Sequence, residues 1–201
     1  MIPVIHKRRL ILAILIVLAL RPAIGFAREA YVPPALDSVH AVAAEHGMVV
    51  AQEKMAARIG ADILRQGGNA VDAAVATGFA LAVTYPRAGN VGGGGFMMIH
   101  LAGRNEDIAI DYRETAPAAT TPEIFLGSDG KPDTTKSRDS ALGIGVPGTV
   151  AGLALALETY GSGKFTLAEI LKPAITLARD GLVLTDDVAD TLPEWYRRLG
   201  K

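Results

Sequence analysis

The strongest constraint on the fold of this chain comes from residues 70–84, a helical stretch without a polar face. Apolar side chains recur on every side of this stretch, and many of them are alanines. A helix that is hydrophobic all round has to be buried. The stretch is also shorter than the about 20 residues that a membrane span requires. We therefore predict a core helix that lies close against a sheet.

Local signals mark the start of this helix and the end of the one before it. A helix is predicted over 53–66, where apolar residues recur on one face. Gly67 and Gly68 end it, because glycine accepts the left-handed conformation at a helix C-terminus. Asn69 then caps the helix over 70–84, with Asp72 three residues on, as in a capping box.

The other segments alternate between strand and helix patterns. Residues 48–51 form a short apolar run typical of a strand, and 96–101 with 108–112 predict a hairpin around a polar turn. Residues 115–140 are rich in Thr, Pro, Gly and charge and predict a long loop. Further helices are predicted over 149–160, over 167–180 and, as a short helix, from 186. This order predicts an α/β (α+β) fold with helices layered on a partly antiparallel sheet.

The N-terminus has the pattern of an export signal. Basic residues at 7–9 precede an unbroken apolar run over 10–20, and small side chains at 25 and 27 suit a signal peptidase. We predict a signal peptide over 1–27 and a mature part over 28–201 without a stable membrane span, located in a bacterial periplasm or secreted. An uncleaved N-terminal anchor is the alternative.

The composition excludes several classes of function. The chain has no cysteine, which excludes disulfides, thiolate metal sites and cysteine nucleophiles. Its formal net charge of −1 provides no basic surface for nucleic acid. His6, His40, His46 and His100 lack metal-ligand spacing, and His100, within an apolar run, is predicted to be a partly buried core residue. We predict no metal, no cofactor and no nucleic-acid partner.

The tetraglycine over 92–95 has two interpretations. Residues without Cβ leave backbone N–H groups open to an anion, as in a phosphate cradle. A phosphate loop, however, continues with Lys-Ser or Lys-Thr and a helix, whereas a strand pattern follows here. We therefore favour a tight turn or close packing at the start of a strand.

Arg113 is the residue whose chemistry we single out. It follows the predicted strand that ends at Tyr112, so a rigid element would deliver its side chain to a cleft. A guanidinium group matches a carboxylate with two parallel hydrogen bonds and suits the anchoring of an amino-acid substrate. From the residues alone we favour the other interpretation, an internal ion pair with Glu114, Asp111 or a distant acid, since most arginines are surface or structural residues.

Several segments together resemble the γ-glutamyltransferase (glutathione hydrolase) family. They run from about residue 39 to 190 in consistent order and comprise 47–51, 67–76, 88–97, 111–117, 145–152 and 177–181. The resemblance implies an N-terminal nucleophile hydrolase fold, an αββα sandwich of which this chain holds the N-terminal portion of the large subunit. It also implies a precursor that cleaves itself, so that the new N-terminal threonine of a small subunit attacks the γ-glutamyl amide.

The same resemblance implies a role for Arg113. The arginine of the matching family motif binds the α-carboxylate of the substrate, so Arg113 is expected to bind glutathione or another γ-glutamyl compound. The small subunit is the expected heterodimer partner. The tetraglycine also matches a family motif, and we treat it as architectural.

The family's catalytic threonine stands in a Thr-Thr-His or Thr-Ser-His context, which this sequence lacks. Its threonine pairs, at 120–121 and 134–135, are followed by Pro122 and Lys136. We therefore predict no catalytic residue in this chain and a fragment that is inactive alone. One alternative is an exported, non-catalytic protein that binds γ-glutamyl compounds or pairs with a separately encoded small subunit. Another is a related amide substrate, as in acylases that share the fold.

Overall fold

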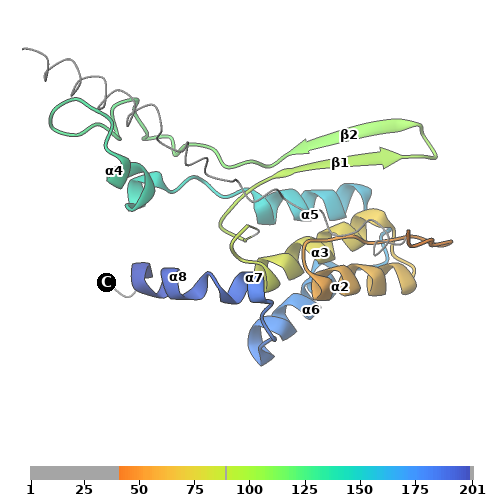
Figure 1. Ribbon diagram of the computed structural model, residues 1–201. Coiled ribbons are helices and arrows are strands. Elements are labelled where there is room, and N and C mark those ends of the chain that lie inside the picture. Colours follow the sequence, from red (N-terminus) through yellow and green to blue (C-terminus); the bar gives the residue numbers. More distant parts are fainter. Residues whose placement is uncertain (1–40, 89, 200–201) are drawn as a thin grey trace, which may run out of the picture. The chain divides into compact units, whose positions relative to one another are not determined.

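The computed structural model describes residues 41–88 and 90–199, nearly all of which belong to one compact unit that starts at Ala44. The predicted signal peptide over 1–27 and its cleavage site lie outside the described residues. The elements follow in the order α2 (Lys54–Arg65), α3 (Ala70–Thr84), β1 (Phe96–Leu101), β2 (Glu106–Asp111), α4 (Thr134–Arg138), the 3-10 turn η2 (Ala141–Gly143), α5 (Thr149–Tyr160), α6 (Leu167–Asp180), α7 (Asp186–Ala189) and α8 (Leu192–Leu199) (Figure 1).

The junction between α2 and α3 confirms the predicted capping signals. Gly67 has a φ of 87°, and its N–H donates to the Leu64 carbonyl at 2.9 Å. The N–H of Gly68 donates to the Ile63 carbonyl at 3.0 Å, which completes a Schellman motif at the end of α2. Asn69 and Asp72 form the predicted capping box at the start of α3.

Helix α3 is the central helix of the unit, as its all-round apolar sequence predicts. Its neighbours are chiefly the helices α2, α5 and α6, rather than the sheet that we predicted. Small side chains permit this arrangement, since a Cβ on Gly60 of α2 would lie only 3.1 Å from the Ala73 carbonyl oxygen of α3. The core also includes Ile99 and Ile110 from the hairpin, Leu153 from α5 and Ile170 from α6.

Strands β1 and β2 form the predicted antiparallel hairpin, with Phe96 opposite Asp111 and Leu101 opposite Glu106. Only one face of β1 packs inward, through Met97, Ile99 and Leu101. On the other face Phe96 is 63% and Met98 72% exposed. β1 is therefore buried on one face and exposed on the other.

Two segments differ from the prediction. Residues 48–51 form no strand, and Val50 is largely exposed. A strand needs a hydrogen-bonded neighbour, and among the described residues only β1 and β2 pair into a sheet. The predicted loop over 115–140 contains the short helix α4, whose N-terminus Asp133 caps by accepting a hydrogen bond from the Thr135 N–H at 2.9 Å.

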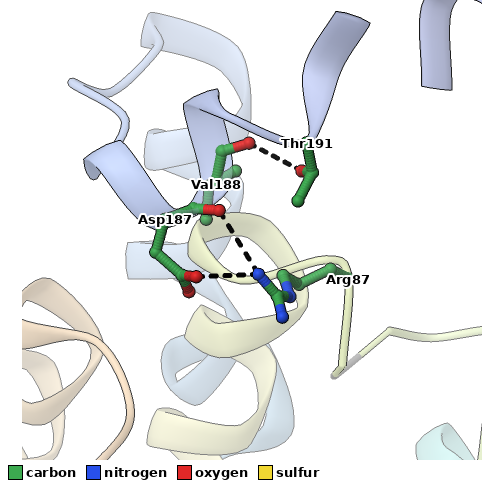
Figure 2. Close-up of polar contacts among 4 residues, drawn as sticks. All are labelled: Arg87, Asp187, Val188 and Thr191. Atoms are coloured by element: carbon green, nitrogen blue, oxygen red, sulfur yellow. Dashed lines mark hydrogen bonds and ion pairs between the residues drawn. The ribbon is translucent and has the colours of Figure 1, made fainter. Parts of the chain in front are cut away.

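The C-terminal helices α7 and α8 follow the predicted helix α6, and α8 was not predicted. Figure 2 shows how α7 joins the turn after α3. Arg87 donates to the Asp187 carboxylate at 2.8 Å and to its backbone oxygen at 3.3 Å. The Thr191 hydroxyl donates to the Val188 carbonyl at 2.7 Å, which shapes the turn between α7 and α8. In the described part of the chain, no helix combines the length and the apolar character of a membrane span.

Candidate functional site

Arg113 lies two residues beyond the end of β2, where the sequence predicted it. Its backbone N–H donates to the Asp111 carboxylate at 3.0 Å, and its side chain is exposed. Among the residues that the structure describes, the guanidinium group has no ion pair, and Asp111 and Glu114 do not form one with it. The guanidinium group is therefore open to an external carboxylate.

The segment that carries Arg113 is fixed on both sides by backbone hydrogen bonds. On the preceding side, the Tyr112 N–H donates to the Gly95 carbonyl at 3.0 Å. On the following side, Thr115 and Val146 form an antiparallel bridge, with N–H to carbonyl distances of 3.4 Å and 2.8 Å. Arg113 is thus held between two anchored residues, although the side chain itself reaches solvent.

The tetraglycine over 92–95 packs against the protein's own backbone. The Gly93 carbonyl accepts hydrogen bonds from the N–H groups of Gly148 at 2.9 Å and Thr149 at 3.0 Å, at the start of α5, which has no side-chain cap. A Cβ on Gly94 would lie 2.6 Å from the Tyr112 carbonyl oxygen. These contacts confirm the prediction of close packing at the start of a strand.

The amides of the tetraglycine are partly committed to internal bonds. The Gly93 N–H donates to the Asn90 carbonyl at 3.2 Å, and the Gly95 N–H to the Tyr112 carbonyl at 3.4 Å. Strand β1 follows at Phe96, whereas a phosphate loop leads into a helix. The phosphate-binding interpretation therefore has no structural support.

A cleft of about 490 Å³ lies beside this segment. Residues 114–117 line one part of it and residues 142–145 another, together with Gly92, Thr120 and Phe125. The Glu114 carboxylate lies near the glycines, 2.8 Å from the position that a Cβ on Gly94 would take. The cleft thus brings together the tetraglycine, the residues after Arg113 and the loop before α5.

The histidines are the other side chains that the sequence analysis considered. In the described ranges, no group of three His, Cys, Asp or Glu side chains could hold a metal ion. His100 is exposed rather than partly buried, because it lies on the outer face of β1, where its Nδ1 is 2.8 Å from the Asp107 carboxylate. His6 and His40 lie outside the described residues.

Sequence reasoning missed the aromatic residue next to Arg113. Tyr112 is partly buried, and burial raises the pKa of its hydroxyl. The signal in the sequence was the pair Gly148 and Gly152, spaced four residues apart on one face of a helix, where the ring of Tyr112 contacts α5.

Comparison with known proteins gives one consistent result. The family model for gamma-glutamyltranspeptidase matches residues 56–201. The chain is 53% identical over 156 residues to the glutathione hydrolase proenzyme of Escherichia coli (strain K12), a match that covers 78% of this chain and 26% of that relative. The chain therefore spans about a quarter of the length of this relative.

Solved structures similar to this chain include members of the same family. The Helicobacter pylori gamma-glutamyltranspeptidase matches with a TM-score of 0.75 and 44% identity, over 79% of this chain and 45% of that one. A cephalosporin acylase from Bacillus halodurans matches with a TM-score of 0.70 and 29% identity, over 87% of this chain and 31% of that one. These neighbours confirm the predicted N-terminal nucleophile hydrolase fold class. This chain belongs to the gamma-glutamyltranspeptidase family.

Proposed function

We propose that this chain is the N-terminal portion of the large subunit of an exported γ-glutamyltransferase that cleaves glutathione and related γ-glutamyl amides. The γ-glutamyl group passes to water, which yields glutamate, or to an acceptor amine, which yields a new γ-glutamyl amide. The observation that carries the proposal is the open guanidinium group of Arg113 on an anchored segment, within the sequence that matches the family.

Arg113 binds the α-carboxylate of the γ-glutamyl group in this proposal. Its planar fork accommodates two carboxylate oxygens with parallel hydrogen bonds. This places the γ-carbonyl away from Arg113, toward a nucleophile. The residues of this chain therefore hold and orient the substrate.

The nucleophile and its partner subunit come from outside these 201 residues in our proposal. The relative from Escherichia coli is named a proenzyme, which supports maturation by cleavage. The N-terminal threonine that this cleavage exposes is part of our proposal. The threonine pairs of this chain are not proposed as the nucleophile. Thr120 lines the cleft, and Thr134 and Thr135 belong to α4. We expect the 201-residue chain alone to be without activity, and γ-glutamyl hydrolysis by the purified chain would contradict this.

Substitution of Arg113 in the complete protein tests the central role. Hydrogen bonds to charged groups contribute about 1.5–3 kcal/mol, so Arg113→Ala should raise the KM for glutathione about 10- to 100-fold. Arg113→Lys keeps the charge but loses the planar fork. Its KM for glutathione should therefore lie between that of the unsubstituted protein and that of Arg113→Ala. The matched control is Arg104→Ala, in the hairpin turn, where the side chain is 64% exposed and pairs with Glu106. An unchanged KM in Arg113→Ala would remove the proposed role.

The fold also supports a second candidate, a related amide substrate, because a cephalosporin acylase matches over 87% of this chain. Arg113 favours a substrate with an α-carboxylate. Comparing glutathione with a cephalosporin side-chain amide on the complete protein separates the two. Cleavage of the cephalosporin amide alone would favour the acylase function.

The exported location and the non-catalytic alternative are tested by the mass of the native product. Two fragments larger than this chain support a self-cleaving enzyme. A single species of the size of residues 28–201 supports the exported binding protein instead. Phe96 and Met98, which are largely exposed, should then make the lone chain aggregate unless a partner covers them.

A further inference from the structure

Tyr112 packs against the backbone at the start of β1 and against α5. Its N–H donates to the Gly95 carbonyl at 3.0 Å, and its carbonyl accepts from the Gly95 N–H at 3.4 Å. Its hydroxyl has one long hydrogen bond, 3.4 Å to the Phe96 carbonyl. The main chain and the ring of Tyr112 therefore hold the residue in place, and the hydroxyl contributes little to its packing.

Three glycines leave the space that Tyr112 fills. A Cβ on Gly95 would lie 3.0 Å from the tyrosine ring. A Cβ on Gly148 would overlap the Tyr112 carbonyl group, and a Cβ on Gly152 would overlap the start of its side chain. We call Gly95, Gly148 and Gly152 the glycine socket. A larger residue at 148 would collide with the backbone of Tyr112, and one at 152 would collide with the Cβ and ring of Tyr112, so either has to displace this residue.

The socket joins the elements that surround the candidate site. The N–H groups of Gly148 and Thr149 are held by the Gly93 carbonyl, which fixes the start of α5 against the tetraglycine. Tyr112 rests on that same turn of α5. Successive side chains of an extended segment point to opposite sides, so a residue with its side chain in the socket directs the next one away from it. That next residue is Arg113.

We propose that Tyr112 is a positioning residue, and that its seat in the glycine socket determines where Arg113 presents its guanidinium group to the substrate. This inference rests on the proposed carboxylate-binding role of Arg113. Bidentate pairing depends on the placement of the fork, and displacement of a binding group by about 1 Å costs up to about 100-fold in rate. Shifting Tyr112 should therefore weaken recognition of the α-carboxylate without removing any group that touches the substrate.

The test compares two substrates that differ only in the α-carboxylate. The complete protein is assayed with γ-glutamyl-p-nitroanilide and with 4-aminobutyryl-p-nitroanilide, and the ratio of the two kcat/KM values is the discrimination. Arg113→Ala should lower it about 10- to 100-fold, and Tyr112→Leu about tenfold. Tyr112→Phe keeps the ring and should leave it unchanged. In the Arg113→Ala background, Tyr112→Leu should cause no further fall, because the two act through one contact.

Two further variants keep a folding defect apart from a positioning defect. Ile170→Ala removes a fully buried side chain on α6, so it should lower the thermal stability and leave the discrimination unchanged. Tyr112→Met has a flexible side chain that fills much of the socket and serves if Tyr112→Leu does not fold. If Arg113→Ala leaves the discrimination intact, the proposed function of Arg113 is wrong. If Arg113→Ala lowers it but folded Tyr112 variants do not, the positioning inference alone is overturned.

Discussion

Asp72 provides the most demanding test of how the helical core is held together. Its side chain is fully buried, and its carboxylate accepts a hydrogen bond from the Asn69 N–H at 2.8 Å. Both carboxylate oxygens also accept from the Ser162 N–H, at 3.1 Å and 3.2 Å. One side chain therefore closes the capping box of α3 and joins α3 to the turn after α5.

Replacing Asp72 with alanine leaves two backbone N–H groups without their acceptor. Each buried donor that loses its partner costs about 1–3 kcal/mol. Both donors are only partly buried, and water relieves part of the loss, so we expect a decrease of about 3 kcal/mol in the free energy of unfolding. With a urea m-value of about 2 kcal/mol per molar, the unfolding midpoint should fall by about 1.5 M. Asp72→Asn retains one acceptor oxygen and should lose about half as much.

Urea unfolding followed by far-ultraviolet circular dichroism measures this difference. The matched control is Glu123→Ala, whose exposed carboxylate has no polar contact among the described residues; it should change the stability by less than about 0.5 kcal/mol. A loss below about 1 kcal/mol in Asp72→Ala would refute the argument that this carboxylate satisfies two otherwise unpaired donors.

Three further predictions concern the same unit. Burial raises the pKa of Glu53, but hydrogen bonds from N–H groups at the start of α2 outweigh this and hold the pKa below its ordinary value of 4.5. The contribution of Glu53 to stability should therefore be complete above that value and disappear as the pH falls through the lowered pKa, which thermal melts of the protein and of Glu53→Gln over a pH series would reveal. Gly60→Ala should cost about 1–3 kcal/mol through overpacking, because its Cβ would lie 2.9 Å from the Val49 side chain; an unchanged melting temperature would contradict that close contact. The Arg87–Asp187 pair in Figure 2 is 38% and 54% exposed, so a double-mutant cycle should give a coupling energy below about 1 kcal/mol, and a much larger value would show that the pair is shielded from solvent.

The elements with local signals were predicted from the sequence. Gly67 and Asn69 define the boundary between α2 and α3 through capping, which depends on a few adjacent residues. The all-round apolar pattern over 70–84 likewise predicted a buried helix. The helices predicted over 149–160 and 167–180 have the same bounds as α5 and α6 in the structure.

The features that depend on distant residues were not predicted. Whether residues 48–51 form a strand depends on a hydrogen-bonded neighbour, which sequence periodicity does not reveal. The exposure of His100 followed from which face of the hairpin turned toward the core, and a continuous apolar run does not determine that face. The seat of Tyr112 required α5 to approach the hairpin closely at Gly148 and Gly152.

The candidate site was predicted in part. The position of Arg113 after a strand followed from the sequence, and its proposed substrate came from the resemblance to the family. The absence of an internal ion pair at Arg113, within the described residues, required the structure.

The most direct measurement of the central claim is a crystal structure of the complete protein with glutamate bound. We predict that the guanidinium group of Arg113 holds the α-carboxylate through two parallel hydrogen bonds of about 2.7–2.9 Å. Glutamate bound with its α-carboxylate on other residues, or Arg113 paired with Asp111 or Glu114 in that complex, would contradict it.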